Sequence, residues 1–107
     1  MRDLQTLIAE RTDQITRELS RQRVTLPDRI LLEAAQVWLA ISRALPEFGE
    51  LDDPDLAFEI LLTFLDDPDA PERVDDADLH MAMAAILSVL HPSRSFNAWK
   101  KHIDATS

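Results

Sequence analysis

Residues 79–90 read LHMAMAAILSVL, and this stretch decides the fold class of the 107-residue chain. Ten of its twelve residues are apolar, and the exceptions, His80 and Ser88, are eight positions apart and therefore share one face of a helix. A helix that is apolar nearly all round must be buried nearly all round. The stretch therefore predicts a buried helix, which we place over residues 76–90.

Two more segments, residues 26–45 and 53–65, have the same character. Together with the quoted stretch, their apolar parts contain 30 apolar residues of 38. A helix over residues 3–22 differs, because it has one narrow apolar stripe and polar residues elsewhere. The stripe consists of Leu4, Leu7, Ile8, Ile15 and Leu19.

A short fifth helix over residues 96–103, capped by Ser95, completes the pattern. Prolines at positions 46, 68 and 92 follow apolar segments closely and act as stops, because the residue before a proline avoids helical geometry. No alternating apolar and polar run favours a strand. The sequence thus predicts an all-α fold: a single small bundle of four main helices plus a short C-terminal helix, forming one domain over residues 1–107.

Three nearly all-apolar helices are too many for the centre of so small a bundle. Either the first and fifth helices wrap them, or another chain covers part of their surface as a dimer or partner contact. The competing interpretation is that small alanines tolerate exposure and inflate the apolar count. Those alanines are Ala34, Ala35, Ala40, Ala82, Ala84 and Ala85. We expect Trp38, Phe58 and Phe64 to be core residues rather than a ligand platform.

The starts of the third and fourth helices share one capping pattern. Asp52 and Asp75 are the predicted N-caps. Leu51 and Val74 would then precede the caps and pack against apolar residues one turn into each helix, as in a hydrophobic staple.

The net charge of -9 is concentrated in one part of the chain. Residues 46–79 contain thirteen acids and one base, whereas the remaining residues carry a small positive excess. Like charges this dense repel one another. The acid-rich segment that we predict as the partner-binding site consists of Asp66, Asp67, Asp69, Glu72, Asp75, Asp76 and Asp78.

Three explanations for this acidic segment remain open: a solvated loop, a docking surface for a basic partner, and a divalent-cation site. A calcium loop usually needs a glycine at its sharp turn, and this segment has prolines instead. Asp76 and His80 are one helical turn apart, but two ligands do not make a metal site. We therefore expect no metal and no cofactor.

The composition also excludes several classes of function. The absence of cysteine excludes a disulfide framework, a thiol nucleophile and a thiolate metal site, and a single glycine excludes a glycine-rich phosphate loop. No arrangement of serine, histidine and carboxylate residues has supporting local context, so we expect no catalytic residues and no enzyme activity. The strong negative charge argues against direct nucleic-acid binding. No apolar run is long enough for a membrane span and no secretory signal opens the chain, so we expect a cytoplasmic protein.

These observations lead to one principal hypothesis and two alternatives. The principal hypothesis is a non-enzymatic interaction module, of the inhibitor or immunity-protein kind, that binds a basic surface on a partner protein. The first alternative is a nucleic-acid mimic that blocks a DNA- or RNA-binding protein, such as a nuclease or a phage-defence complex. Mimicry would require carboxylates along an elongated face that includes Glu47, Glu50, Asp52 and Glu59. The second alternative is a structural homodimer formed through apolar helix faces.

Overall fold

The computed structural model describes residues 3–65 and 76–106, and all of the regular structure in these ranges is helical. The prediction of an all-α fold with four main helices and a short C-terminal helix is confirmed. The last helix continues three residues beyond its predicted end, and one short 3₁₀ helix was not predicted. In chain order the elements are α1 (Leu4–Arg21), α2 (Asp28–Ala44), the 3₁₀ helix η1 (Pro46–Glu50), α3 (Pro54–Leu65), α4 (Asp76–Leu90) and α5 (Phe96–Thr106).

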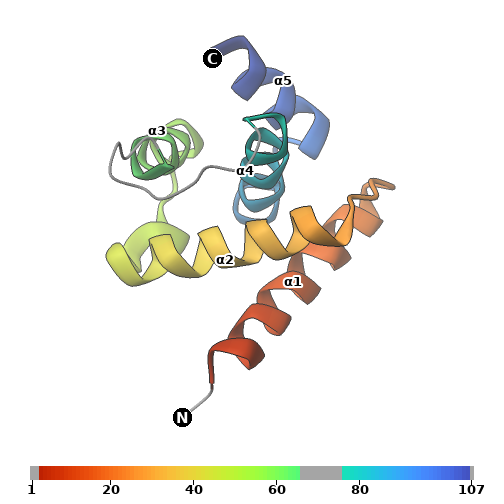
Figure 1. The fold of residues 1–107 in the computed structure, drawn as a ribbon. Helices are drawn as coiled ribbons and strands as arrows, with labels where there is room; N and C mark the ends of the chain where they lie inside the picture. The colour runs from red at the N-terminus through yellow and green to blue at the C-terminus, as the bar shows by residue number, and fades with distance from the viewer. Residues whose placement is uncertain (1–2, 66–75, 107) are drawn as a thin grey trace.

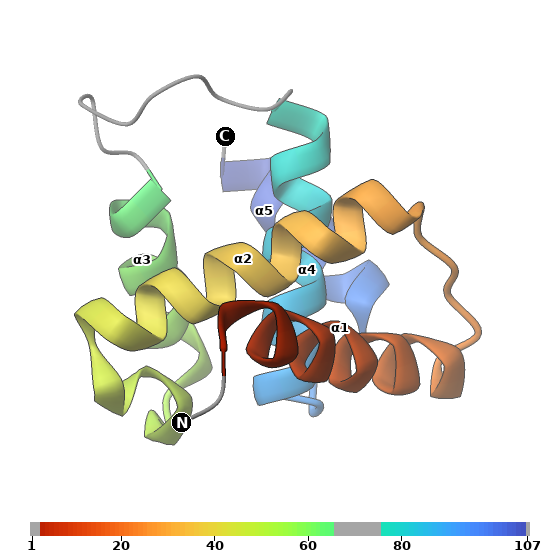
Figure 2. The same cartoon turned by 60° about the horizontal axis from the view of Figure 1, so that its bottom comes forward.

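Helix α4 is the centre of the fold and packs against all four other α-helices. Its residues 82–88 are each at most 1% exposed. Figures 1 and 2 show α2 crossing α4 steeply, with α3 beside one half of α2, and Figure 2 shows α5 passing behind α4. The polar residue inside this segment, Ser88, donates its hydroxyl to the carbonyl of Ala85 at 3.0 Å, so its burial leaves no unmet hydrogen bond.

Most of the six alanines named in the sequence analysis belong to the core. Five of them are fully buried, and Ala40 is exposed. Exposure of alanine is therefore the wrong explanation for the apolar excess. The large exposed apolar side chains are leucines instead, namely Leu4, Leu32, Leu56 and Leu62. Trp38 and Phe58 are core residues as predicted, at 4% and 5% exposure, and Phe64 is half-buried.

Helix α1 buries only the C-terminal part of its apolar stripe. Ile15 and Leu19 are in the core, Leu7 and Ile8 are half-buried, and Leu4 is 48% exposed. The N-terminal half of the helix therefore presents apolar side chains at the surface.

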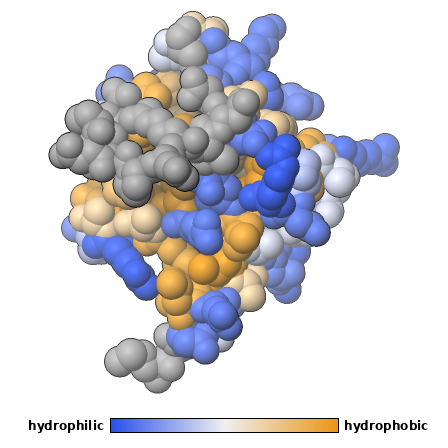
Figure 3. Space-filling model, in the orientation of Figure 1, coloured by the Kyte–Doolittle hydropathy of each residue, from blue (hydrophilic) through white to orange (hydrophobic). Residues whose placement is uncertain are grey.

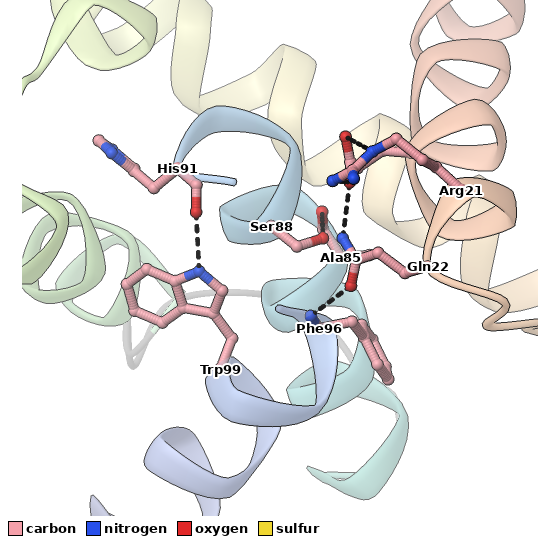
Figure 4. A network of polar contacts seen from close by, with 8 residues as sticks. Arg21, Gln22, Ala85, Ser88, His91, Phe96 and Trp99 are labelled. Carbon is pink, nitrogen blue, oxygen red and sulfur yellow. Dashed lines mark hydrogen bonds and ion pairs between the residues drawn. The ribbon is translucent and has the colours of Figure 1, made fainter. Parts of the chain in front are cut away.

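Helix α5 is attached to α1 by the side chain of Gln22. Its amide oxygen accepts a hydrogen bond from the backbone N–H of Phe96 at 2.7 Å, and its amide nitrogen donates to Glu18 at 2.7 Å (Figure 4). Ser95 caps the same helix by accepting from the backbone N–H of Ala98 at 3.1 Å, which confirms the predicted cap. Two orphan donors at the start of α5 are thus satisfied, one of them by a residue 74 positions away.

The end of α4 meets α5 at His91. The indole N–H of Trp99 donates to the carbonyl of His91 at 3.4 Å (Figure 4). The ring of His91 is 9% exposed, and its Nε2 has no hydrogen-bond partner among the described residues. Burial lowers the pKa of His91, the nearby Arg94 lowers it further, and Asp52 and Asp53 oppose these effects.

Replacing Gln22 should weaken the attachment of α5. Gln22→Ala removes the distant cap and the contact with Glu18, and we expect it to lower the free energy of unfolding by about 1–2 kcal/mol. Urea denaturation followed by circular dichroism measures this change. Gln14→Ala, at an exposed glutamine within α1, is the matched control and should change stability by less than about 0.5 kcal/mol. Equal effects of the two substitutions would show that the cap contributes nothing.

The neutral form of His91 should make stability depend on pH. Because its folded pKa is lowered, the histidine binds a proton more readily in the unfolded chain. Its stabilising contribution is therefore complete above pH about 6.5, the ordinary histidine pKa, and is lost as the pH falls below that value. We expect His91→Phe to remove part of the loss that the wild-type chain shows on acidification. Urea unfolding at a series of pH values tests this, and parallel stability curves for the two proteins would contradict it.

Candidate functional site

Most of the predicted partner-binding segment lies outside the described residues. Asp66, Asp67, Asp69, Glu72 and Asp75 are in the range that is not described, and Asp76 is described only as the first residue of α4. Asp78 is described fully: its side chain is 16% exposed and forms an ion pair with Arg29 near the start of α2. Asp78 therefore already has a basic partner within the fold, one that ties α4 to α2.

The structure does describe a second group of acids, just before this segment in the chain. It lies on η1, on the turn after it and on the first half of α3, and we name it the η1–α3 acidic surface. All six of its side chains are exposed, and residues 46–59 contain no lysine or arginine. Its members are Glu47, Glu50, Asp52, Asp53, Asp55 and Glu59.

Helix capping accounts for one of these acids, and it is not the predicted one. Asp53 Oδ1 accepts hydrogen bonds from the backbone N–H groups of Asp55 at 3.0 Å and Leu56 at 3.4 Å, so Asp53 is the N-cap of α3. The prediction of Asp52 as N-cap is wrong by one residue, because Pro54 takes the first helical position, which suits its fixed φ angle. The proposed staple between Leu51 and Leu56 loses its spacing as a result. The corresponding cap at Asp75 lies outside the described residues.

One basic residue partly neutralises this surface. The guanidinium of Arg94 is 3.0 Å from the carboxylate of Asp55 and lies 4.7 Å from the ring centroid of Trp99. Arg94 thus connects the turn before α5 to the start of α3. Of the described ion pairs this is the one that reaches the η1–α3 acidic surface, which leaves the surface strongly negative.

The three histidines do not form a common site. His80 Nδ1 is 3.0 Å from Asp104, His102 packs edge-on against Phe58, and His91 is buried at the end of α4. A hydrogen bond from Lys100, followed by one from His80, lowers the pKa of Asp104. Among the side chains that the structure describes, no three histidine or carboxylate groups are placed to hold a metal ion.

An apolar groove, whose position no sequence pattern indicated, lies on the outside of α1 and α2. Figure 3 shows apolar surface over the crossing of these two helices and on toward the N-terminus. The groove has a larger part of about 490 Å³ and a smaller part of about 170 Å³, which meet at Ile8. The exposed Leu4 and Leu32 belong to its lining. The apolar excess of the second helix pointed to such a surface, but not to its position.

No helix in the described ranges is both long enough and apolar enough to cross a membrane.

Comparison with known proteins gives no relative from which a function could be transferred. The chain matches no protein-family model, no curated protein and no solved structure.

Proposed function

We propose that this protein is a non-catalytic interaction module that binds a basic surface of a partner protein through its acidic residues. The observation that carries the proposal is the η1–α3 acidic surface, six exposed carboxylates within thirteen residues. We also propose a cytoplasmic location, which the cysteine-free composition supports.

The internal needs of the fold explain only part of this charge. Capping uses Asp53, and an ion pair with Arg94 uses Asp55. The remaining four acids are exposed, and no described contact accounts for them. Their mutual repulsion opposes folding, and a basic partner would relieve it.

The expected role of such a surface is to accelerate and select association. Complementary charge raises the rate of encounter and disfavours acidic competitors. Each exposed ion pair contributes only about 0.2–1 kcal/mol, so binding would depend on several carboxylates acting together and would weaken with added salt. The acid-rich segment from Asp66 to Asp78 follows α3 in the chain and adds further negative charge to the protein.

Neutralising the acidic surface should weaken partner binding. Glu47→Gln, Glu50→Gln and Glu59→Gln combined should reduce affinity about tenfold, since three weak charge contacts are lost together. The triple variant leaves the cap at Asp53 intact. The partner is captured from a lysate of the source cell, eluted with increasing salt, identified by mass spectrometry and then titrated as a purified protein. A second variant, with Asp66, Asp67 and Asp69 changed to Asn, tests the segment predicted from the sequence.

The matched control removes the same amount of charge from other elements. Asp28→Asn, Glu33→Gln and Asp104→Asn combined give the same net charge and should leave the affinity unchanged. If neither acidic variant binds less tightly than the control, the proposal is wrong. If the captured protein binds DNA or RNA and the nucleic acid competes with this chain, the carboxylates act as a nucleic-acid mimic at the same surface.

A further inference from the structure

The groove on the outside of α1 and α2 is formed by one face of each helix. The residues that line the groove on α1 are spaced about one helical turn apart, and so are those that line it on α2. Side chains three and four apart share a face, so the two series run along the groove as its walls. We call this feature the α1–α2 groove and define it by Leu4, Ile8, Thr12, Leu32, Leu39 and Ala40.

Several polar groups in the groove need no partner from outside. The hydroxyl of Thr12 donates to the carbonyl of Ile8 at 2.8 Å, and that of Thr16 donates to the carbonyl of Thr12 at 2.8 Å. Both threonines can therefore present their methyl groups to an occupant. At the edge, Asp13 and Arg17 are 2.6 Å apart in an ion pair, with side chains 56% and 77% exposed. Gln5, Gln36 and Arg43 also line the groove, so an occupant must either pair with these side chains or leave them in contact with water.

The charge around the groove favours a second copy of this chain over a foreign protein. Residues 4–44, which include α1 and α2, carry five acids and six bases. Residues 46–79 carry thirteen acids and one base. A foreign basic protein would be steered to the acidic part. Two copies of a protein with a net charge of -9 can approach only through a face that carries little net charge, and the α1–α2 groove lies on such a face.

The arrangement of the helices keeps α3 away from such a contact. In Figure 1, most of α1 and all of α3 lie on opposite sides of α2. Two copies that meet at the groove would therefore keep their α3 carboxylates apart, whereas η1 begins three residues after Arg43 of the groove lining and lies near one end of the contact. Salt at physiological strength screens charges beyond about 8 Å. The edge is also self-complementary, because in a two-fold contact Asp13 of one copy can meet Arg17 of the other, and the reverse.

We infer that the α1–α2 groove is the interface of a symmetric homodimer, in which exposed leucine side chains of each copy enter the groove of the other. The inference does not depend on the acidic surface binding a partner. It accounts for the exposure of Leu4 at 48% and Leu32 at 45%.

The oligomeric state of the full chain tests this inference. Sedimentation equilibrium of the wild-type protein, from micromolar to near-millimolar concentration, should show a dimer that persists in about 1 M NaCl, where charge contacts are screened. Leu32→Glu should raise the dimer dissociation constant about 30-fold or more, because a carboxylate would be buried at the centre of the contact. Leu32→Ala should raise it by a smaller factor. Circular dichroism verifies that both variants keep their helical content.

Leu62→Glu is the matched control, because Leu62 is 38% exposed on α3, away from the groove. It should leave the dissociation constant unchanged. A wild-type monomer at every concentration, or equal effects of Leu32→Glu and Leu62→Glu, would overturn the inference. The triple glutamine variant of the acidic surface should still dimerise and Leu32→Glu should still bind a basic partner, so failure of one proposal is distinguishable from failure of the other.

Discussion

Residues 82–88 of α4 have no exposed side, and the rest of the structure depends on that burial. A helix buried all round requires neighbours in every direction, and the chain supplies α1, α2, α3 and α5. The side chains of Ala82, Ala84 and Ala85 are short, so the neighbouring helices can approach the backbone of α4 closely. The buried serine uses its own helix for its hydrogen bond, and no second polar group has to be brought into the centre.

Because α2 and α3 each pack one face against α4, some apolar side chains on their other faces remain exposed in the described part of the chain. Each covering helix is apolar over more of its circumference than α4 can bury, which leaves Leu32 on α2 and Leu62 on α3 exposed. The face of α2 that does not pack on α4 contacts only part of α1, because the buried residues of α1, Ile15 and Leu19, lie near its C-terminal end. The α1–α2 groove thus follows from the packing: four helices cannot both surround α4 and cover one another completely.

Local features of this fold were predictable from the sequence, whereas features joined across long separations were not. Helix ends and caps depend on residues a few positions apart: the ends of α1, α3 and α4 lie within one residue of their predicted positions and the cap at Ser95 is confirmed, whereas α2 starts two residues later and α5 ends three residues later than predicted. The hydrogen bond from Phe96 to Gln22 spans 74 positions, and no local pattern marks it. The turn that follows α1 also had no local signal, although the helix end was predicted: Arg23 takes a left-handed conformation, with φ of 61°, at a position where glycine is the usual signal. Backbone hydrogen bonds from Arg23 to Ser20 and from Val24 to Leu19 hold it there.

The same difference holds for the candidate site: its composition was predictable from the sequence, and its long-range contacts were not. An excess of acid was evident from composition, but the pairing of Asp78 with Arg29 joins residues 49 positions apart and removes one of the predicted contacts from the free surface. The sequence predicts Asp52 as the cap of α3, whereas the carboxylate that caps the helix is that of Asp53. What remains is a chain with two faces of different physical character. One is negative, would act at a distance and would weaken with salt; the other is apolar, carries little net charge and would act only in contact. A dimer formed through the apolar face would carry two copies of the acidic face. A partner with two basic surfaces could then bind both copies, and the second contact would form at an effective concentration set by the geometry of the dimer rather than by the partner concentration in solution.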